Sequence, residues 1–300
     1  MKRRELLQLA VLTGLTSSLP GMLKAAPEAA SSSDEVKLLT PPAAGHIPVA
    51  FLLAEGAVVI DFAGPWEVFE NVHIPGPTPH PFQLYTVAES EAPIKASGGM
   101  KILPNYTLAN APLPKIIVIP AQREPSAALL DWIRKCSRTA DLTMSVCTGA
   151  FVLAKTGLLA GKSATTHHGA YAEFAMAYPD VFLKRGARFV EVGNLATSGG
   201  LSSGIDLALR VVERYYGRSL AQSTAGNLEY QGLGWTNPDS NSIYARRRTS
   251  TDEHPVCPVC DMEVDRASSP KSVYRGHAYY FCMPTHKKLF DSEPDRFVDA

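Results

Sequence analysis

From Ile47 onward the chain alternates short apolar runs with amphipathic stretches, and this alternation constrains the fold more than any other feature. The apolar runs have the length of strands that are buried on both faces. Strands that alternate with helices form a mostly parallel sheet with helices on both faces, a three-layer α/β sandwich. Strands are predicted at residues 47–53, 82–87, 115–120 and 142–146, and helices from residue 64, over 125–136, over 148–159 and over 202–216.

The first 30 residues have the pattern of an export signal. Lys2, Arg3 and Arg4 precede an apolar run, residues 6–19, which is shorter than the roughly 18–20 residues needed to span a bilayer. The arginine pair resembles a twin-arginine signal, so we expect a periplasmic or otherwise exported protein. An uncleaved membrane anchor and a surface helix are the alternatives. Residues 31–46 are rich in Ala, Ser and Pro and predict a flexible leader.

Cys147 stands at the junction of a predicted strand and a predicted helix, in the segment SVCTGA. A side chain at such a corner projects from the carboxyl end of the sheet, where open α/β sheets bind ligands. The free N–H groups of the following helix should stabilise the thiolate, and the small Gly149 and Ala150 permit the tight turn. A buried, inert cysteine is the alternative. Cys136, on the predicted amphipathic helix, has no comparable context.

Two other ionisable residues stand out. Asp61 interrupts an apolar stretch, so its carboxylate needs a partner or a raised pKa, unless it simply caps a helix. His167 lies in the segment ATTHH, and a histidine beside a thiolate acts as a base or an ion-pair partner. Sequence alone does not place His167 beside Cys147, so a packed or surface histidine is the alternative.

Residues 47–235 resemble the ThiJ/PfpI superfamily, with the flavodoxin-like, class I glutamine-amidotransferase-like fold. The resemblance is carried by three segments: LLAEGAVVIDFAGPWEVF (52–69), SVCTGAFVLAKTGLLAGKSATTHH (145–168) and ATSGGLSSGIDLALRVVE (196–213). The phrases DFAGPWEVF and VCTGA are most similar to the isonitrile-hydratase-like branch. The resemblance implies an α/β domain that acts on a small-molecule electrophile without a cofactor.

The resemblance also implies roles for four residues. Cys147 corresponds to the nucleophile at the elbow, and Asp61 to the acidic residue that hydrogen-bonds it. Thr148 would offer its backbone N–H and its hydroxyl to a developing anion, and His167 matches the histidine of the family's TTH motif. In the hydratase branch the thiolate attacks the isonitrile carbon, a proton is delivered through the acidic residue, and water releases an N-substituted formamide.

Other functions are also consistent with this family. Its members include glyoxalases, chaperones and redox sensors, so a metal-handling or redox-sensing protein without turnover is the alternative function. Related regulators continue into a helix-turn-helix region, whereas here Trp235 is followed by a polar linker, residues 236–253. Basic and acidic residues number 29 each, so nucleic-acid binding is not expected. Because members often dimerise, a homodimer is an expected assembly.

Residues 254–300 predict a small metal-associated module. Two residues separate Cys257 from Cys260 and three separate Cys282 from His286, which is the spacing of metal ligands. A hairpin is predicted from residues 272–274 and 278–281, followed by a helix over 284–290 that carries His286 on its first turn. A segment this small cannot bury a firm core, so a bound metal ion is the expected staple.

This segment resembles a YHS domain through CPVCDMEV, YYFC and FDSEPDRF. Asp261 stands where the family usually has glycine, and His286 stands where it commonly has a further cysteine. Three thiolates and one imidazole suit zinc best, and the nearby Met262 and Met283 would also suit copper(I).

Two alternatives remain for these ligands. In an oxidising compartment, Cys257 and Cys260 would form a disulfide, leaving Cys282 and His286 merely packed. His277 is an alternative nitrogen donor. The segment has no basic excess, so a nucleic-acid-binding finger is not expected.

Overall fold

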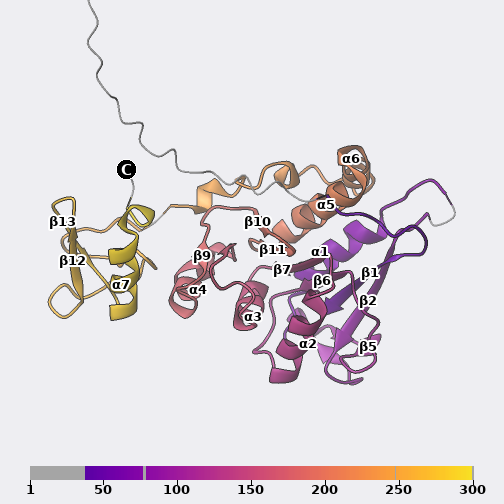
Figure 1. Ribbon diagram of the computed structural model, residues 1–300, viewed down its shortest axis with the longest axis horizontal. Helices are drawn as coiled ribbons and strands as arrows, with labels where there is room; N and C mark the ends of the chain where they lie inside the picture. Colours follow the sequence, from indigo (N-terminus) through magenta and orange to yellow (C-terminus); the bar gives the residue numbers. More distant parts are fainter. Residues whose placement is uncertain (1–37, 77–78, 247, 299–300) are drawn as a thin grey trace, which may run out of the picture. The chain divides into compact units, whose positions relative to one another are not determined.

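The computed structural model describes residues 38–76, 79–246 and 248–298, so the predicted export signal lies outside the described residues. Its centre is a seven-stranded sheet in the order β10-β11-β7-β6-β1-β2-β5 (Figure 1). Neighbouring strands are parallel, except for the antiparallel pair β10 and β11. The strands are β1 (Ile47–Leu52), β2 (Phe82–Ala88), β5 (Tyr106–Thr107), β6 (Ile116–Ile119), β7 (Leu142–Val146), β10 (Phe189–Val192) and β11 (Leu195–Ser198).

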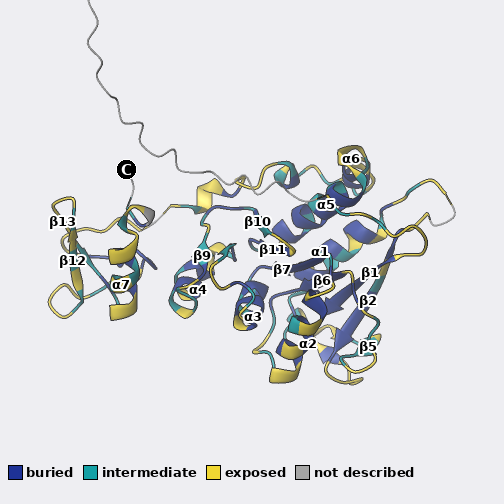
Figure 2. Ribbon diagram, in the orientation of Figure 1, coloured by how far each residue is buried: buried dark blue, intermediate teal, exposed yellow. Residues whose placement is uncertain are grey.

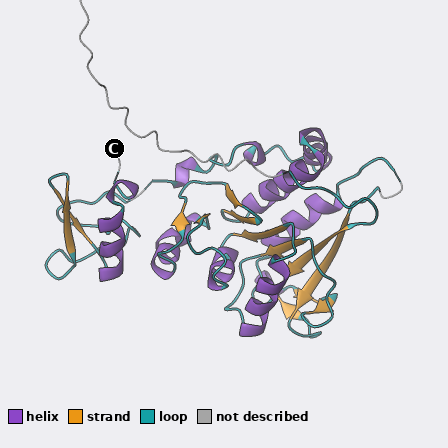
Figure 3. Cartoon of the chain, in the orientation of Figure 1, coloured by secondary structure: helices purple, strands orange, loops and turns teal. Residues whose placement is uncertain are grey.

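Helices cover both faces of this sheet, because side chains alternate along each buried strand. In β1, Val49 and Phe51 belong to one hydrophobic core, whereas Ala50 and Leu52 belong to the other. Figure 2 shows the central strands as buried, and Figure 3 shows the helices around them. The first core also contains residues of α1 (Val59–Glu70), α5 (Ser203–Tyr216) and α6 (Arg218–Asn227). The second contains residues of α2 (Ala127–Ser137), α3 (Gly149–Lys155) and α4 (Tyr171–Ala177). The predicted three-layer α/β fold is confirmed.

Two predicted helix boundaries are wrong. A helix was expected to begin at Gly64, but α1 begins at Val59 and carries Pro65 in its interior. Proline removes only one helical N–H donor, and the buried face of α1 supplies the packing that holds the helix together. The helix after Cys147 was expected to reach residue 159, but α3 ends at Lys155. Gly157, with φ 82°, then turns the chain away.

Residues 254–298 contain the predicted hairpin and helix. Strands β12 (Lys271–Tyr274) and β13 (His277–Tyr280) pair antiparallel, and α7 runs over Pro284–Ser292. The hairpin turn uses Arg275 and Gly276, both with positive φ, as the twist of a tight hairpin requires. Phe281 and Phe290 are fully buried in a third hydrophobic cluster, which also contains Cys257 and Cys260.

The remaining elements are short. Two small sheets pair β3 (Ile94–Lys95) with β4 (Lys101–Ile102) and β8 (Ser163–Ala164) with β9 (Phe182–Leu183). The 3-10 turns are Ser97–Gly99, His168–Ala170, Gly234–Thr236, Ser242–Tyr244 and Pro294–Arg296. Across the described ranges, no helix has both the length and the apolar character needed to cross a bilayer.

Candidate active site and metal cluster

Cys147 occupies a sharp corner between β7 and α3. Its φ is 58°, in the left-handed region that non-glycine residues rarely adopt, so the surrounding structure must hold this conformation. Its backbone N–H donates to the Gly199 carbonyl at 3.0 Å, and its carbonyl accepts from the Thr166 hydroxyl at 3.0 Å. These bonds fix the thiol at the carboxyl end of the sheet.

Gly149 makes the corner sterically possible. A Cβ atom at this position would lie 2.2 Å from the Ile119 carbonyl oxygen and 2.8 Å from that of Pro120. The first turn of α3 therefore approaches the end of β6 more closely than any side chain would permit. This contact accounts for the glycine two residues after the thiol.

Asp61 is the carboxylate partner of this thiol. It is the third residue of α1, fully buried, and Val58 rather than Asp61 occupies the N-cap position. Its Oδ2 accepts the Ala121 backbone N–H at 3.1 Å, and its carboxylate lies close enough to the Cys147 thiol for each group to shift the pKa of the other. Within the described ranges Oδ1 has no hydrogen-bond partner. Asp61 is therefore a buried acid whose free oxygen is available to the thiol.

The electrostatics of the pair oppose a preformed thiolate. Burial raises the pKa of Asp61 to about 6, although the Ala121 N–H and the Cys147 thiol each lower it. Burial, followed by the charge of Asp61, raises the pKa of Cys147 to about 11. Backbone N–H groups of Thr148 and Leu201 hydrogen-bond the sulfur and lower this pKa only in part. The expected stabilised thiolate is thus wrong: at neutral pH a thiol faces an ionised carboxylate.

Thr148 has the position expected of it, and Leu201 is a contact that the sequence analysis missed. Thr148 is the N-cap residue of α3, and its side chain caps no backbone N–H. Leu201 has φ 52° and lies between β11 and α5. The two glycines that precede Leu201 indicate a tight loop, but no sequence signal assigns that loop to Cys147.

His167 does not hydrogen-bond the thiol within the described residues. Its Nδ1 accepts the Gly169 backbone N–H at 3.1 Å, and a Cβ on Gly200 would lie 2.0 Å from its Cδ2. Burial and the neighbouring His168 lower its pKa. His167 therefore packs against the loop that presents the Leu201 N–H to the sulfur. The structure brings Cys147, Asp61 and Thr148 together and places His167 beside their supporting loop.

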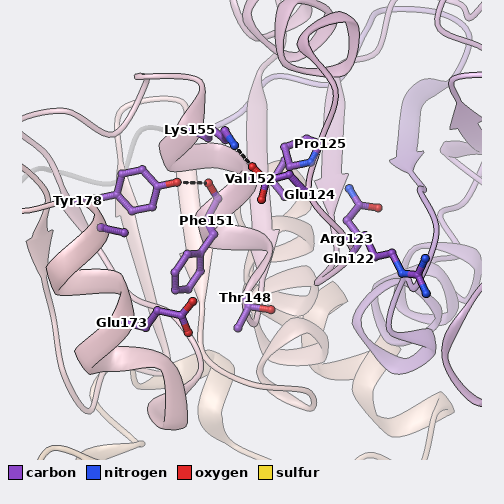
Figure 4. Close-up of a pocket in the computed structure, with 11 residues that line it drawn as sticks. Gln122, Arg123, Glu124, Pro125, Thr148, Phe151, Val152, Lys155, Glu173 and Tyr178 are labelled. Carbon is purple, nitrogen blue, oxygen red and sulfur yellow. Dashed lines mark hydrogen bonds and ion pairs between the residues drawn. The ribbon is translucent and has the colours of Figure 1, made fainter. Parts of the chain in front are cut away.

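A cavity of about 410 Å³ opens beside this corner, with Thr148 in its wall (Figure 4). Phe151, Val152 and Tyr178 form an apolar side of the cavity. The Tyr178 hydroxyl donates a hydrogen bond to the Phe151 carbonyl at 3.2 Å. The other lining residues are Gln122, Arg123, Glu124, Pro125, Lys155, Glu173 and Ala177. The cavity has the size of a small-molecule site, and Thr148 lines it whereas Cys147 does not.

A second constellation lies at the C-terminal end of the described chain. The ligand atoms of Cys257, Cys260, Cys282 and His286 all lie within 4.8 Å of one another, and only Cys282 is partly exposed. The Cys260 and Cys282 sulfurs are 3.5 Å apart, and His286 Nδ1 lies 3.6 Å from the Cys257 sulfur and 3.2 Å from the Cys282 sulfur. The cluster contains His286 and not His277, and the five cysteines are free thiols.

These distances fit a tetrahedral metal ion. Zinc–ligand bonds of normal length would place sulfurs about 3.7 Å apart and a sulfur about 3.6 Å from the nitrogen. Hydrogen bonds from Cys260 and His286 lower the pKa of Cys257, whereas the contact with Cys257 raises the pKa of Cys260. Ionisation of one thiol therefore opposes ionisation of its neighbours, and a bound metal ion would hold all three sulfurs as thiolates.

Asp261 stands at the position where the YHS-like sequences usually have glycine, and its backbone conformation shows why glycine suits this position. Its φ is 61°, so it adopts the left-handed conformation that favours glycine. Its carboxylate accepts a hydrogen bond from Arg185 at 2.6 Å, with both side chains nearly buried. The Arg185 guanidinium also lies over the Tyr171 ring, 5.3 Å from its centroid. An ion pair thus offsets the backbone strain next to the ligand Cys260.

Comparisons with known proteins agree with this fold. The DJ-1/PfpI family model matches residues 48–214. The isonitrile hydratase of Pseudomonas putida is 32% identical over 194 residues, which cover 61% of this chain and 78% of that protein. The HTH-type transcriptional regulator CdhR of Pseudomonas aeruginosa is 30% identical over 180 residues, 57% of this chain but only 51% of the regulator.

A solved structure shares the fold. A ThiJ/PfpI family protein from Pseudomonas syringae superposes with a TM-score of 0.56 at 24% identity, over 72% of this chain and 83% of that chain. The family match stops before the C-terminal cysteines, so the YHS resemblance of residues 254–300 stays a prediction.

Proposed function

This chain belongs to the DJ-1/PfpI family, and we propose that it is a cysteine-dependent enzyme that hydrates isonitriles to N-substituted formamides. One observation carries the proposal: the Cys147 thiol lies close enough to the buried carboxylate of Asp61 for each group to shift the pKa of the other. The terminal carbon of an isonitrile must receive both a nucleophile and a proton. A thiol paired with a carboxylate can supply both. The similarity to isonitrile hydratase supports this choice of substrate class.

The reaction has two balanced stages. In the first, the Cys147 sulfur bonds to the terminal carbon of R–N≡C while Asp61 takes the thiol proton and delivers it to the same carbon, giving R–N=CH–S–Cys147. In the second, water adds to this carbon, the C–S bond breaks, the nitrogen gains a proton and the thiol is restored. The sum is isonitrile plus water giving R–NH–CHO, without an oxidant or a cofactor.

The surrounding residues support these steps. Backbone N–H groups of Thr148 and Leu201 hydrogen-bond the sulfur, so they stabilise its charge as the proton leaves. Burial sets the Asp61 pKa at about 6, which suits a group that must accept and return a proton near neutral pH. Neither step requires His167, whose place beside the Leu201 loop suits a positioning role.

Formamide release from a panel of isonitriles, followed by mass spectrometry, tests the proposal. Wild-type protein should release the formamide, and Cys147→Ala should abolish turnover. Cys136→Ala is the matched control, because Cys136 is a buried thiol of the other core and should leave turnover intact. Formamide release by Cys147→Ala at the wild-type rate would refute the proposal.

The C-terminal cluster favours a second, separate function. We propose that Cys257, Cys260, Cys282 and His286 bind one zinc ion, with copper(I) as the alternative, in a YHS-like module; the ligand set and its spacing support this. Elemental mass spectrometry of the purified protein should find about one metal ion per protein chain. A Cys257→Ser/Cys260→Ser variant should lose it, and metal content unchanged in that variant would refute the site. The alternative of metal handling or redox sensing without turnover predicts metal binding but no formamide.

Export is a further part of the proposal, supported by the sequence pattern of residues 1–30. Fusion of residues 1–46 to a reporter that is active only outside the cytoplasm tests it. Replacement of Arg3 and Arg4 by lysine should trap the reporter inside the cell if the twin-arginine route is used. An unchanged distribution of the reporter would argue against that route.

A further inference from the structure

The cavity beside Thr148 contains one unneutralised acidic group. Four charged side chains line it, and two of them, Lys155 and Glu124, form an ion pair with each other. Arg123 packs its stem on Gly56, with Cγ 3.2 Å from the position of a Cβ there. Figure 4 shows the Arg123 guanidinium at the opposite end of the cavity from Glu173. The Glu173 side chain makes no ion pair or hydrogen bond within the described ranges, whereas its backbone belongs to helix α4.

Glu173 faces an apolar surface across this cavity. It lies in the first turn of α4, and Figure 4 shows its carboxylate directed toward the Phe151 ring and the side chain of Thr148. Phe151, Val152 and Tyr178 contribute hydrocarbon, and the Tyr178 hydroxyl is already bonded to the Phe151 carbonyl. The cavity therefore offers a ligand an apolar wall and the Glu173 carboxylate at one end, with the Arg123 guanidinium at the other end.

Thr148 connects this cavity to the nucleophile. Its backbone N–H hydrogen-bonds the Cys147 sulfur, while the same residue lines the cavity. Cys147 itself does not line the cavity, so Thr148 is the residue that links the cavity to the sulfur.

We propose that Glu173 is a specificity-determining residue, and that the cavity selects electrophiles whose substituent is apolar along its length and cationic at its end. This inference deepens the proposed function, since it requires Cys147 to be the reacting group. Glu173 is exposed, so the attraction is partly screened by water and salt, and the expected selectivity is about three- to fivefold.

A pair of thiol reagents of equal shape tests the inference without requiring hydration. One is an iodoacetamide whose side chain ends in a trimethylammonium group, and the other ends in a tert-butyl group. Labelling of Cys147 at pH 9 is followed by mass spectrometry of its peptide. For each thiol, the rate with the cationic reagent is divided by the rate with the neutral one. This ratio should be about three to five times larger for Cys147 than for free cysteine, and added salt should reduce the difference.

Two variants and a control complete the experiment. Glu173→Gln should remove the preference, and Glu173→Lys should reverse it, while labelling by the neutral reagent stays unchanged. Asp180→Asn is the matched control, because Asp180 is an exposed acid just beyond α4 that does not line the cavity, and it should retain the preference. Equal labelling by the two reagents, a preference that survives Glu173→Gln, or no labelling of Cys147 by either reagent would each overturn the inference.

An isonitrile pair of the same two shapes separates this inference from the proposed function. Absence of formamide from both isonitriles, with the labelling preference intact, would refute hydration and leave the role of Glu173 standing. Formamide released equally fast from both, with equal labelling, would refute the role of Glu173 and leave hydration standing.

Discussion

A buried thiol and a buried carboxylate that lie close together can hold a single proton between them. Cys147 and Asp61 form such a pair, because burial raises the pKa of both groups and the charge of Asp61 further opposes ionisation of Cys147. The two groups titrate as a coupled pair, so the reactivity of Cys147 depends on the protonation state of Asp61. The thiol is poised to react in one step with an acceptor that also needs a proton, as an isonitrile does.

The pH dependence of hydration follows from Asp61. The carboxylate must be ionised to accept the thiol proton, so kcat/KM should rise with an apparent pKa of about 6 and stay level to about pH 9. Formamide release measured from pH 4 to pH 9 checks this. If kcat/KM stayed constant down to pH 4, or rose with an apparent pKa near that of a free thiol, the role of Asp61 would be contradicted.

Asp61→Asn should stabilise the fold at pH 8 while it lowers turnover. In the wild type the folded-state pKa is about 6 and the ordinary value is 3.8. The folded state therefore holds the proton more tightly, and stability is lost as the pH rises from about 4 to about 6. Asparagine can still accept the Ala121 N–H without this cost, so the free energy of unfolding should rise by up to about 3 kcal/mol at pH 8.

Urea denaturation at pH 8 and at pH 4 measures this effect. The difference between the variant and the wild type should shrink at pH 4, where the carboxyl is largely protonated in both states. If the variant were less stable than the wild type at pH 8, burial of the ionised Asp61 carboxylate would not be what destabilises the wild-type fold.

At the residue scale the sequence singled out Cys147 and Asp61 but misjudged the ionisation of the thiol. The strand–helix corner and the interrupted apolar stretch identify Cys147 and Asp61. The direction of the Cys147 pKa was wrong, because the sequence shows the helix N–H groups that lower it but not the burial that outweighs them. The Leu201 contact was missed, because it depends on two segments about 50 residues apart.

At the scale of elements, the ends of β6 and β7 and the start of α3 form one steric unit. Gly149 lies so close to the Ile119 carbonyl that any side chain must separate these elements. The sequence predicted β7 at its observed bounds, because its apolar run is buried on both faces. It placed the start of α1 five residues too late, because Pro65 was taken as the helix opening although packing keeps it inside the helix.

Gly149→Ala should destabilise the fold and displace the thiol. The new Cβ would lie 2.2 Å from the Ile119 carbonyl oxygen, so we expect a loss of about 1–3 kcal/mol and reduced formamide release. Gly226→Ala in α6 is the control, because nothing lies within 4 Å of its Cβ position and alanine favours the helix by about 1 kcal/mol. Thermal unfolding of both variants tests this, and equal melting temperatures would contradict the steric argument.

At the scale of the whole molecule, the thiol–carboxylate pair and the metal-ligand cluster lie in different hydrophobic cores. The Cys147–Asp61 pair is built on the seven-stranded sheet, and the four metal-ligand side chains lie with the third cluster around Phe281 and Phe290. The fold class was predictable, because alternating strands and helices leave few architectures. The C-terminal hairpin, helix and ligand cluster were predictable from cysteine spacing and turn residues. The Arg185–Asp261 ion pair was not, because it joins residues 76 positions apart.

Metal removal should act on the C-terminal cluster alone. Without a cation, contact with Cys257 opposes ionisation of Cys260, and a core of this size depends on a bound metal ion. A chelator should therefore make residues 254–298 exchange backbone amide hydrogens faster, while the central strands stay protected. Hydrogen exchange followed by mass spectrometry measures this, and protection of residues 254–298 that is unchanged by the chelator would contradict the metal as a staple.

The resting state of the Cys147–Asp61 pair is tested most directly by the rate of Cys147 alkylation as a function of pH. With a neutral iodoacetamide and mass spectrometry of the Cys147 peptide, the rate constant should still rise about tenfold per pH unit between pH 8 and pH 10, since the pKa of Cys147 is about 11. Asp61→Asn should move the midpoint down toward the value of an ordinary thiol. A wild-type rate that reaches its plateau below pH 7 would reveal a preformed thiolate and contradict the account.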